Sequence, residues 1–542
     1  MQKLVLTMLD TSGIQAYIFN SNRLQENIGA SELVYRATTL WAFDELHQVT
    51  GGSHNIQQPG KLNWEYDPNA LIEKDDGPAA EVVYAGGGNT FVIFREKETA
   101  LQFTGQLTRR ILRDAPNLTV VAQHLEFEWG KDELRDKRKA LLQKLAQHKQ
   151  SRQPSLPLLG LSVSAVCQST GLPAVRNDTG KITIEREEIS LRLKGQEADP
   201  PRLLSRETVA KIGWRDASNR RLRKELGNYD FTFNIDNLGR IKGEESYVAV
   251  VHADGNRMSE HLNAATQNAT TPREVITALR NFSTNINTAS LEALKHVVQL
   301  VDKAIQNPES EIPHEGDILP FRPLVFGGDD VTFLCNGQIG VSAAVAYLEA
   351  FERETAKLGF KDMHARAGIT IVKMHYPFAR AYKLSEELAG SAKRFIKTDT
   401  AADCSAFDWH YASGGLSGEL KVIREREYEV KEGLLTMRPL ALERGDKESN
   451  RRYWHNGIER VVHEFKYKWK ERKNKVVGLR EPLRKGADHV ATYCRNFELG
   501  PLPALPGTNA QETGWHDGRC VYFDAVELFD HYLPLEKQEV PA

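Results

Sequence analysis

Cysteine, long apolar runs and net charge are all scarce in this sequence. No run approaches the ~18 consecutive apolar residues of a membrane span. The first 13 residues pass from a short apolar stretch into polar residues without a signal-peptide cleavage pattern. The five cysteines are odd in number and far apart, which fits neither a disulfide framework nor a tetrahedral zinc site: Cys167, Cys335, Cys404, Cys494 and Cys520. We therefore expect a cytoplasmic protein in a reducing compartment, with no membrane partner.

The length and the charge balance of the chain are those of a globular protein with several domains. Charged residues make up 27% and hydrophobic residues 40%, as in ordinary globular proteins, and the net charge of −2 does not by itself indicate a nucleic-acid partner. At 542 residues the chain is too long for one ordinary hydrophobic core, so that roughly three to four domains are expected.

The most informative feature that is present is an internal repeat. A strand-like run ending at Asp10 precedes a helical stretch, a β-rich hairpin around Gly86, another helical pattern and a last strand. The same order recurs after a strand ending at Asp254, with its hairpin at Gly327. The intervals are 76 positions in the first copy and 73 in the second. This pattern predicts an α+β protein with two ferredoxin-like βαββαβ modules.

The hairpin of the second copy, "PLVFGGDDVTFLC", carries two adjacent aspartates, Asp329 and Asp330, after Gly327 and Gly328. Gly-Gly-Asp-Asp is also ordinary turn chemistry. In a βαββαβ sheet, however, Asp254 would end the neighbouring strand, and three converging carboxylates repel one another unless cations lie between them. Such oxygen-rich sites suit Mg²⁺ or Mn²⁺, and two ions about 3.5–4 Å apart can drive phosphoryl transfer. The combination favours a metal site.

The first copy has Gly88 and Asn89 where the second has Asp329 and Asp330. A neutral turn cannot hold two divalent ions, so we expect the first copy to be catalytically silent. Its open glycine turn could still receive a nucleotide, because glycine lets a base or phosphate approach the backbone closely.

Several motifs together resemble a known family. The sequence resembles the large subunit of type III CRISPR interference complexes (the Csm/Cmr large-subunit family). The resemblance rests on six runs: "LDTSGIQAYIF", "IGASELV", "YAGGGNTFVIF", "VVHADGNRM", "LVFGGDDVTFL" and "ARAGITIVKMHYPFARAYKLSEELAGSAK". The resemblance implies paired palm domains related to nucleotide cyclases and polymerases. It also implies a metal-dependent nucleotidyltransferase of antiviral defence that cyclises ATP into oligoadenylates and releases pyrophosphate.

The resemblance assigns roles residue by residue. It implies that Asp254, Asp329 and Asp330 are the metal ligands and catalytic residues. The implied nucleotide-binding residues are Gly327, Gly328 and Lys393 in the second copy, with Gly86, Gly87 and Gly88 bordering a second ATP at the interface of the palms. A solvated helix lysine is an equally good interpretation of Lys393.

The chain also departs from the family. The first palm strand begins within ten residues of the N-terminus, so no HD nuclease domain and no single-stranded DNase activity are expected. A zinc-ribbon frame survives around Cys167, but Thr170 stands where a second thiol would be needed. We expect a degenerate first palm (1–150), a connector with this degenerate segment (151–245), a catalytic second palm (246–440) and a helical C-terminal domain (441–542).

Residues 451–485 carry twelve Lys and Arg against four Glu, with aromatic residues interleaved. Such a stretch could contact guide RNA or other subunits of a type III complex. A solvated amphipathic helix with an apolar stripe is the alternative, which the sequence favours slightly. A homo-oligomer is also compatible with the sequence.

Two other functions compete with the cyclase. A catalytically weak or inactive palm pair could serve as a scaffold that binds RNA and partner subunits, and the missing HD and zinc elements favour it. A diguanylate cyclase shares the palm, but its turn would end in a glutamate and a sensor domain would be expected. The intact Gly-Gly-Asp-Asp turn favours the oligoadenylate cyclase.

Overall fold

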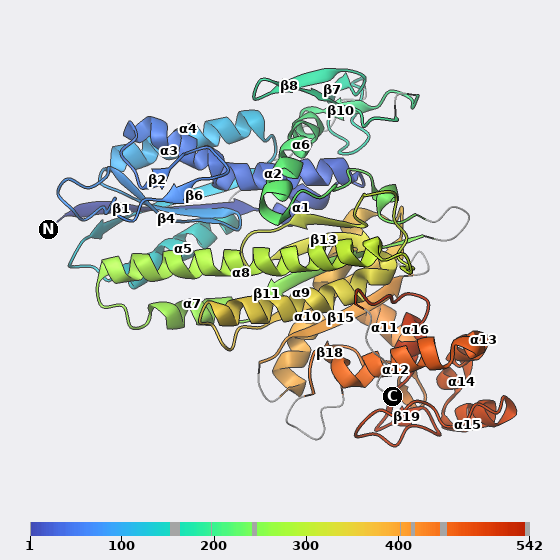
Figure 1. The fold of residues 1–542 in the computed structure, drawn as a ribbon. Helices are drawn as coiled ribbons and strands as arrows, with labels where there is room; N and C mark the ends of the chain where they lie inside the picture. Colours follow the sequence, from blue (N-terminus) through green and yellow to red (C-terminus); the bar gives the residue numbers. More distant parts are fainter. Residues whose placement is uncertain are drawn as a thin grey trace.

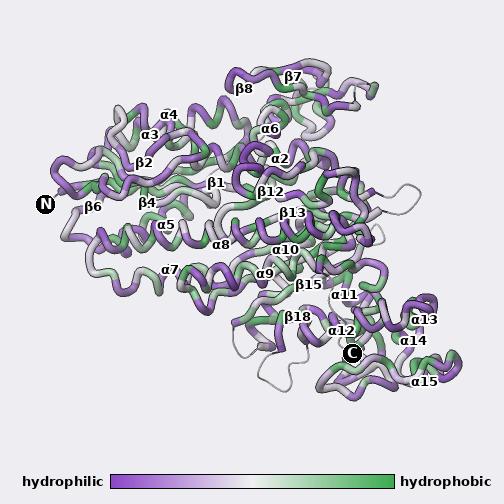
Figure 2. The backbone as a smooth tube through the Cα atoms, viewed as in Figure 1, coloured by the Kyte–Doolittle hydropathy of each residue, from purple (hydrophilic) through white to green (hydrophobic). Residues whose placement is uncertain are grey.

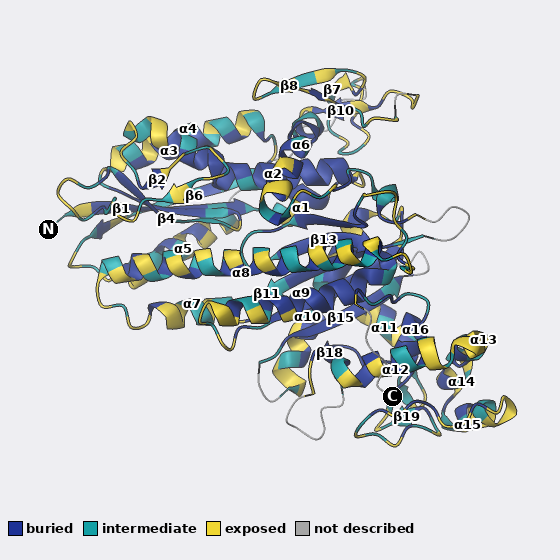
Figure 3. Cartoon of the chain, viewed as in Figure 1, coloured by how far each residue is buried: buried dark blue, intermediate teal, exposed yellow. Residues whose placement is uncertain are grey.

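The computed structural model describes residues 2–151, 163–196, 198–240, 246–400, 403–412, 418–444 and 452–536. Two βαββαβ units, one following the other, each build a central sheet (Figure 1). The α+β palm-pair fold predicted from the repeat is confirmed. The strands of both sheets are largely buried, whereas the outer sides of the covering helices are exposed (Figure 3). No helix in the described ranges is long and apolar enough to cross a membrane.

The first palm contains a four-stranded sheet in the order β4-β5-β1-β6. Strand β1 pairs antiparallel with both β5 and β6. The elements are β1 (Lys3–Ser12), α1 (Ile14–Phe19), α2 (Leu24–Thr38), α3 (Leu40–Thr50), β2 (Ile56–Gln57), β3 (Glu65–Tyr66), β4 (Ala80–Gly86), β5 (Asn89–Phe94), α4 (Lys97–Asp114), β6 (Thr119–Glu128) and α5 (Leu134–Ser151).

Strand β1 is apolar almost throughout because both faces of its sheet are covered. Val5 and Leu9 share a core with helices α2, α3 and α4. Leu4, Leu6 and Met8 face the opposite way, into a core completed by α5 and by the start of α8. Alternate residues of a strand point to opposite faces, so a strand buried on both sides needs a continuous apolar run.

The connector comprises β7 (Ala174–Asn177), β8 (Lys181–Ile184), β9 (Glu187–Ser190), β10 (Leu203–Ser205), α6 (Arg206–Leu226) and the 3₁₀ turn η1 (Ile235–Asn237). Helix α6 packs closely on α2, since a Cβ at Gly29 would lie 1.6 Å from the carbonyl oxygen of Lys211. In the degenerate zinc-ribbon frame, the Cys167 sulfur lies 3.3 Å from the hydroxyl of Thr208, and the hydroxyl of Thr170 lies 3.1 Å from that of Ser205.

The second palm has a six-stranded sheet in the order β12-β13-β11-β14-β15-β18. Strand β11 is antiparallel to β13 and β14, and β15 extends the sheet parallel to β14. The elements are β11 (Tyr247–Gly255), α7 (Met258–Thr266), α8 (Pro272–Gln306), β12 (Phe321–Val325), β13 (Val331–Asn336), η2 (Gly337–Ile339), α9 (Gly340–Lys357), β14 (Ala365–Lys373), α10 (Phe378–Asp399), β15 (Ala406–Ala412), α11 (Leu420–Tyr428), β16 (Glu429–Val430), β17 (Gly433–Leu434) and β18 (Leu440–Ala441).

Helix α8 ties the two palms together. It has 35 residues, which at 1.5 Å per residue span about 52 Å. Its first turns pack under the first sheet, and its later residues join the core of the second palm. Arg273 and Arg280 near its start pair with the fully buried Glu81 of β4. Hydrophilic and hydrophobic residues alternate along the helix, as expected when one face is buried (Figure 2).

The C-terminal part is mainly helical, as predicted, and shares a continuous hydrophobic core with the second palm. A small sheet, β16-β17-β20-β19, joins it to the segment after α11. The elements are η3 (Trp454–Ile458), α12 (Glu459–His463), η4 (Glu464–Lys468), η5 (Lys470–Arg472), α13 (Lys473–Gly478), α14 (Arg480–Lys485), α15 (Ala487–Asn496), β19 (Trp515–His516), β20 (Arg519–Cys520) and α16 (Phe523–Leu528). The predicted domain boundaries at 150, 245 and 440 stay predictions.

Most aromatic residues of the basic segment are core residues. Tyr453, Trp454 and Phe465 are buried and Trp469 is partly buried against the same core, whereas Tyr467 is 44% exposed. This arrangement agrees with the amphipathic-helix alternative, in which the lysines face water and the aromatic stripe faces inward.

Candidate active site

Strand register brings the predicted acidic residues to one edge of the second sheet. Ala253 pairs with Val331 across β11 and β13, so Asp254 follows at the end of β11 just as Asp330 precedes β13. The hairpin tip packs directly on this strand end, because a Cβ at Gly255 would lie 3.0 Å from the Cβ of Asp329. The neighbouring positions on β11 and the hairpin are therefore adjacent in space, as the repeat predicted.

The carboxyl groups of Asp254 and Asp329 lie within hydrogen-bonding reach of each other. Burial and the like charge of Asp254 together raise the pKa of Asp329 to about 7. Burial, followed by the charges of Asp254 and Glu386, also raises the pKa of Asp330 to about 7. Carboxylates crowded in this way are unfavourable as free anions, and a nearby cation would relieve the repulsion.

Two basic side chains stand against the acidic cluster. Arg366, which pairs with Asp254 across β11 and β14, donates a hydrogen bond to the Asp254 carboxylate. The same guanidinium donates to the Gly255 carbonyl at 3.0 Å and to the Asn256 side chain at 3.1 Å, which fixes its direction. Burial lowers the pKa of His252, so its ring is neutral at pH 7. Its Nδ1 lies 3.4 Å from Oδ1 of Asp330.

The chemistry of the donor set fits a divalent cation, although the ligands are not gathered around one point. Oδ1 of Asp330 is sealed from solvent and accepts no hydrogen bond, so that this buried carboxyl oxygen is available as a ligand. Within the described ranges, no three or more His, Cys, Asp or Glu side chains are already arranged as a metal cluster. One oxygen of Asp254 is directed to Arg366. Ligation by all three aspartates therefore requires carboxylate rotation.

The glycine turn leaves room beside the carboxylates. Gly327 and Gly328 have φ of 123° and 88°, a region that favours glycine. The amide of Gly328 donates to Oδ1 of Asn287 in α8 at 3.1 Å, and a Cβ at Gly328 would meet nothing within 4 Å. The first-palm turn lies alongside, since a Cβ at Gly87 would be 4.0 Å from the carbonyl oxygen of Gly327.

The three glycines of the first-palm turn differ in their surroundings. A Cβ at Gly86 would meet nothing within 4 Å, so this position is open. Gly88 instead packs against its own palm, where a Cβ would lie 2.6 Å from the hydroxyl of Thr11. Of the three, Gly87 faces the Gly327 turn of the second palm, whereas Gly88, in the same two-residue turn, packs on its own palm.

The first palm carries a neutralised counterpart of the acidic edge. Asp10 pairs with Asn89 across β1 and β5, the position equivalent to Asp330. The amino group of Lys149, from α5, lies 2.6 Å from Oδ2 of Asp10 and donates to the Thr11 carbonyl at 3.1 Å. This lysine is a counter-ion of Asp10, and the catalytic silence of the first copy stays a prediction.

Lys393 stands apart from the acidic edge. It is exposed on α10 and makes no hydrogen bond or ion pair with the described chain. Glu386, whose charge acts on Asp330, lies seven residues earlier on the same helix face, about 10 Å away along the axis. Lys393 could reach only a group that extends well beyond the carboxylates, such as a triphosphate.

Sequence reasoning missed four residues of this site. Arg366, Asn287, Glu386 and Lys149 come from elements far from the hairpin in the sequence. Of these four, only Arg366 could have been found from the sequence. Its strand was predicted to pair with 247–255, and the alternation of side chains along that strand would have placed Arg366 beside Asp254. Asn287 in α8 and Lys149 in α5 reach the site through helix packing, and no pattern in the nearby sequence indicates their roles.

Comparisons with known proteins agree with this architecture. Residues 247–402 match the family model described as "Cas10/Cmr2, second palm domain". Csm1 of T. onnurineus shares the fold with a TM-score of 0.51 at 14% identity, covering 98% of this chain and 70% of that one. No curated protein sequence matches the chain.

Structures of a Csm1–Csm4 cassette are similar to the same extent. The complex with pppApApA gives a TM-score of 0.51 at 14% identity and covers 97% of this chain and 69% of that one. The complex with cA4 gives a TM-score of 0.50 at 13% sequence identity and covers 97% of this chain and 70% of that one. At these identities the likeness establishes a shared fold.

Proposed function

We propose that this chain is a metal-dependent nucleotidyltransferase that cyclises ATP into oligoadenylates. The match of residues 247–402 to the Cas10/Cmr2 second palm domain supports the proposal. The observation that carries the proposal is that the carboxyl of Asp254, at the end of β11, comes within reach of that of Asp329 in an open glycine hairpin. Beside them, Oδ1 of Asp330 accepts no hydrogen bond. In the family, this palm is a nucleotide cyclase.

Mg²⁺ or Mn²⁺ held by Asp254, Asp329 and Asp330 would supply activation of a 3′-hydroxyl and neutralisation of charge on the transferring phosphoryl group. The turn at Gly327 and Gly328 lets phosphates approach the backbone without a side-chain barrier. Asn287 and Arg366 hold the turn and the Asp254 carboxylate in place.

The first palm supplies the other wall of the proposed site. Gly86 and Gly87 leave open space opposite the catalytic turn, where an acceptor ATP would bind next to the donor. The neutral Asn89 and the Lys149–Asp10 ion pair remove the charge that would hold metal on this side. One palm would therefore perform chemistry while the other orients a substrate, and catalysis would depend on the two turns staying adjacent.

The test compares matched pairs of adjacent aspartates. The double variant Asp329→Asn, Asp330→Asn is incubated with ATP and Mg²⁺, with and without partner subunits and target RNA, and products are separated by chromatography. We expect loss of at least about 100-fold in turnover, because the proposed metal ligands are removed. The exposed pair Asp75 and Asp76, changed in the same way, should leave turnover unaltered. Equal product from both double variants would reject the proposal.

A second candidate function is a scaffold that binds RNA and partner subunits. The engagement of Asp254 by Arg366, with no preassembled metal cluster in the described ranges, favours it. Assembly into a guide-RNA particle that never converts ATP, even with target RNA and Mn²⁺, would favour the scaffold. Either function assigns the chain to the cytoplasm, where its five thiols stay reduced.

A further inference from the structure

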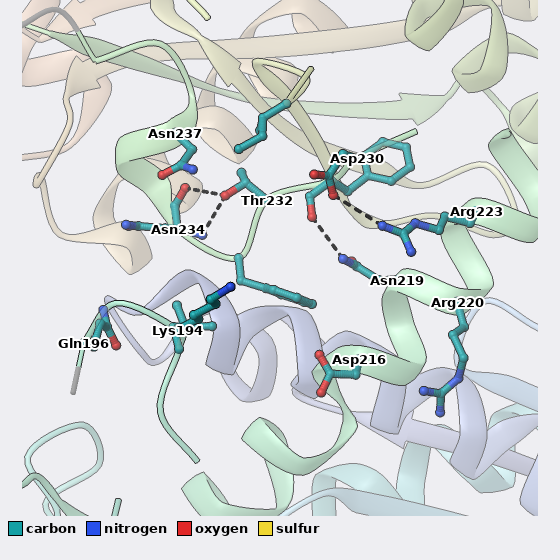
Figure 4. A pocket seen from close by; sticks show the side chains of 14 residues that line it. Lys194, Gln196, Asp216, Asn219, Arg220, Arg223, Asp230, Thr232, Asn234 and Asn237 are labelled. Carbon is teal, nitrogen blue, oxygen red and sulfur yellow. Dashed lines mark hydrogen bonds and ion pairs between the residues drawn. The ribbon is translucent and has the colours of Figure 1, made fainter. Parts of the chain in front are cut away.

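A cavity outside the candidate active site lies beside the connector helix α6. It has a volume of about 650 Å³ and is enclosed by α6, by the loop at 193–196 and by the segment 230–237 (Figure 4). Ile318, which precedes β12, also lines it, so it lies at the opposite end of β12 from the catalytic turn. We call it the connector cavity. A volume of this size suits a ligand of nucleotide dimensions.

Three cations and two carboxylates, Asp216 and Asp230, line the connector cavity. Arg220 pairs with Glu187 at 2.8 Å and Arg223 with Asp230 at 3.3 Å, so both have local counter-ions. Lys194 lines the cavity, is exposed and makes no ion pair within the described chain. A lysine without a carboxylate partner at the mouth of a cavity is available to bind an anionic group.

One wall of the cavity is aromatic and has positive charge behind it. Phe233 is half-buried and lines the cavity, and the guanidinium carbons of Arg215 and Arg322 each lie 5.6 Å from its ring centroid. Arg322 is fully buried without a carboxylate partner, and its Nε and Nη2 make no hydrogen bond. An unpaired buried charge creates a positive potential that favours an anion nearby.

Amide side chains complete the lining. Asn219, which is buried, donates to the Phe231 carbonyl at 3.0 Å and accepts from Arg322, so it holds the inner wall. Asn234 and Asn237 face the cavity from the opposite element (Figure 4). Amides present donors and acceptors together, as base edges do. Aromatic, amide and cationic groups in one cavity match the three parts of a nucleotide.

We propose that the connector cavity binds a nucleoside phosphate, with the base against Phe233 and the phosphate at Lys194. The shared chemistry has two sources, a free mononucleotide and one nucleotide of a single-stranded RNA. The lining argues against an apolar ligand, since ten of the fourteen residues are charged or carry an amide or hydroxyl. The proposal does not depend on catalysis in the second palm.

The test measures binding with the proposed palm site disabled. The variant Asp329→Asn, Asp330→Asn in EDTA removes metal-dependent triphosphate binding, so failure of the cyclase proposal leaves this assay intact. Fluorescent AMP and a 5′-phosphorylated single-stranded tetranucleotide are titrated separately by anisotropy. Binding of AMP alone identifies a mononucleotide site, and binding of the tetranucleotide alone identifies an RNA site. Binding of neither probe overturns the proposal.

Site variants locate the binding. In the same background, Lys194→Glu should weaken binding at least fivefold and reduce its salt dependence, because a phosphate contact is lost. Phe233→Leu keeps an apolar side chain but removes the ring face, and should weaken binding about fivefold or more. Lys224→Glu, an exposed lysine on α6 outside the cavity, is the matched control and should change affinity less than twofold. Equal affinities in all three variants would overturn the assignment.

Photo-cross-linking gives a readout independent of affinity. An azidoadenosine or thiouridine probe bound at the cavity should label the tryptic peptide 225–240, which contains Phe231, Phe233 and Asn234. Excess unlabelled AMP or tetranucleotide should remove the label. Labelling confined to peptides outside the cavity lining would also overturn the proposal.

Discussion

Arg366 and Asp254 are paired across adjacent strands, and the guanidinium of the first donates to the carboxylate of the second. This arginine is buried and also satisfies the Gly255 carbonyl and the Asn256 side chain. It therefore offsets part of the repulsion among the aspartates and fixes the direction of one of them. Without it, the end of β11 would hold an unpaired carboxylate and two unsatisfied acceptors.

Replacing Arg366 should destabilise the protein and loosen the site. We expect Arg366→Gln to lower the free energy of unfolding by about 2–4 kcal/mol, since breaking a buried ion pair leaves polar groups without partners. Urea unfolding measures the change. The exposed Arg353, which pairs with Glu354 at 3.1 Å, is the control, and Arg353→Gln should change stability by less than about 0.5 kcal/mol. Equal changes in the free energy of unfolding for the two variants would contradict a special contribution of Arg366 to stability.

The aspartate pair should make stability fall with pH. Burial and neighbouring carboxylates raise the pKa of Asp330 from 3.8 to about 7, so the proton stabilises the folded state. That contribution is complete below pH 4 and is lost as pH rises through 7. Asp330→Asn should therefore raise the melting temperature at pH 8 and leave it nearly unchanged at pH 4. A gain of order 1 kcal/mol is expected, because the side chain is partly solvated.

Mg²⁺ should act in the same direction as this substitution if the aspartates ligate it. Thermal unfolding of the wild type at pH 8 should shift upward with Mg²⁺, whereas Asp330→Asn should show a smaller shift. An identical Mg²⁺ shift in both proteins would contradict ligation by Asp330.

His455 should stabilise the protein at neutral and acidic pH, through its protonated ring. Burial lowers its pKa, but hydrogen bonds to Glu349 and Glu459 outweigh this and raise the pKa to about 10. Because the folded-state pKa is raised, the contribution is complete below about pH 6.5 and disappears as pH rises through 10. His455→Gln should cost roughly 2–4 kcal/mol at pH 6.5 and little at pH 10.5. The exposed His489→Gln serves as control, and a pH-independent cost would contradict the assignment.

Asn287 should position the Gly327–Gly328 turn of the proposed active site without contacting the substrate. Its side-chain oxygen accepts the Gly328 amide at 3.1 Å. Asn287→Ala should reduce kcat about tenfold and leave the melting temperature within a few degrees, because one hydrogen bond is lost at the turn. Asn281→Ala, on the exposed side of the same helix, should change neither. If Asn287→Ala lowered the melting temperature by many degrees together with kcat, the role of Asn287 would be purely structural.

Gly87 should matter for the second substrate. It has φ of 58° and faces the Gly327 carbonyl, so Gly87→Val adds both backbone strain and bulk between the turns. We expect KM for ATP to rise about tenfold or more as the shared space closes. Gly130→Val is matched in strain, with φ of 78°, but nothing lies near it, and it should leave KM unchanged. Equal KM values in the two variants would contradict an acceptor site between the palms.

The pattern of the sequence predicted the two palms because it records local and periodic features. Strand runs ending at Asp10 and Asp254, with hairpins at matching intervals, fix the βαββαβ order. Once that order is given, antiparallel pairing places Asp329 beside the end of β11. The core role of Trp454 and Phe465 was less certain from sequence, because a basic amphipathic helix and a nucleic-acid surface share one composition.

The sequence by itself determined the repeat, the acidic hairpin and the neutral turn of the first copy, since these depend on residues close along the chain and on strand alternation. Only the tertiary structure decided that Lys149 pairs with Asp10, that Arg366 and Asn287 contact Asp254 and the Gly328 amide, and that Phe233 and Lys194 share a cavity. Such contacts join helices and loops whose approach is set by side-chain packing over the whole core. No periodicity in the sequence records that packing.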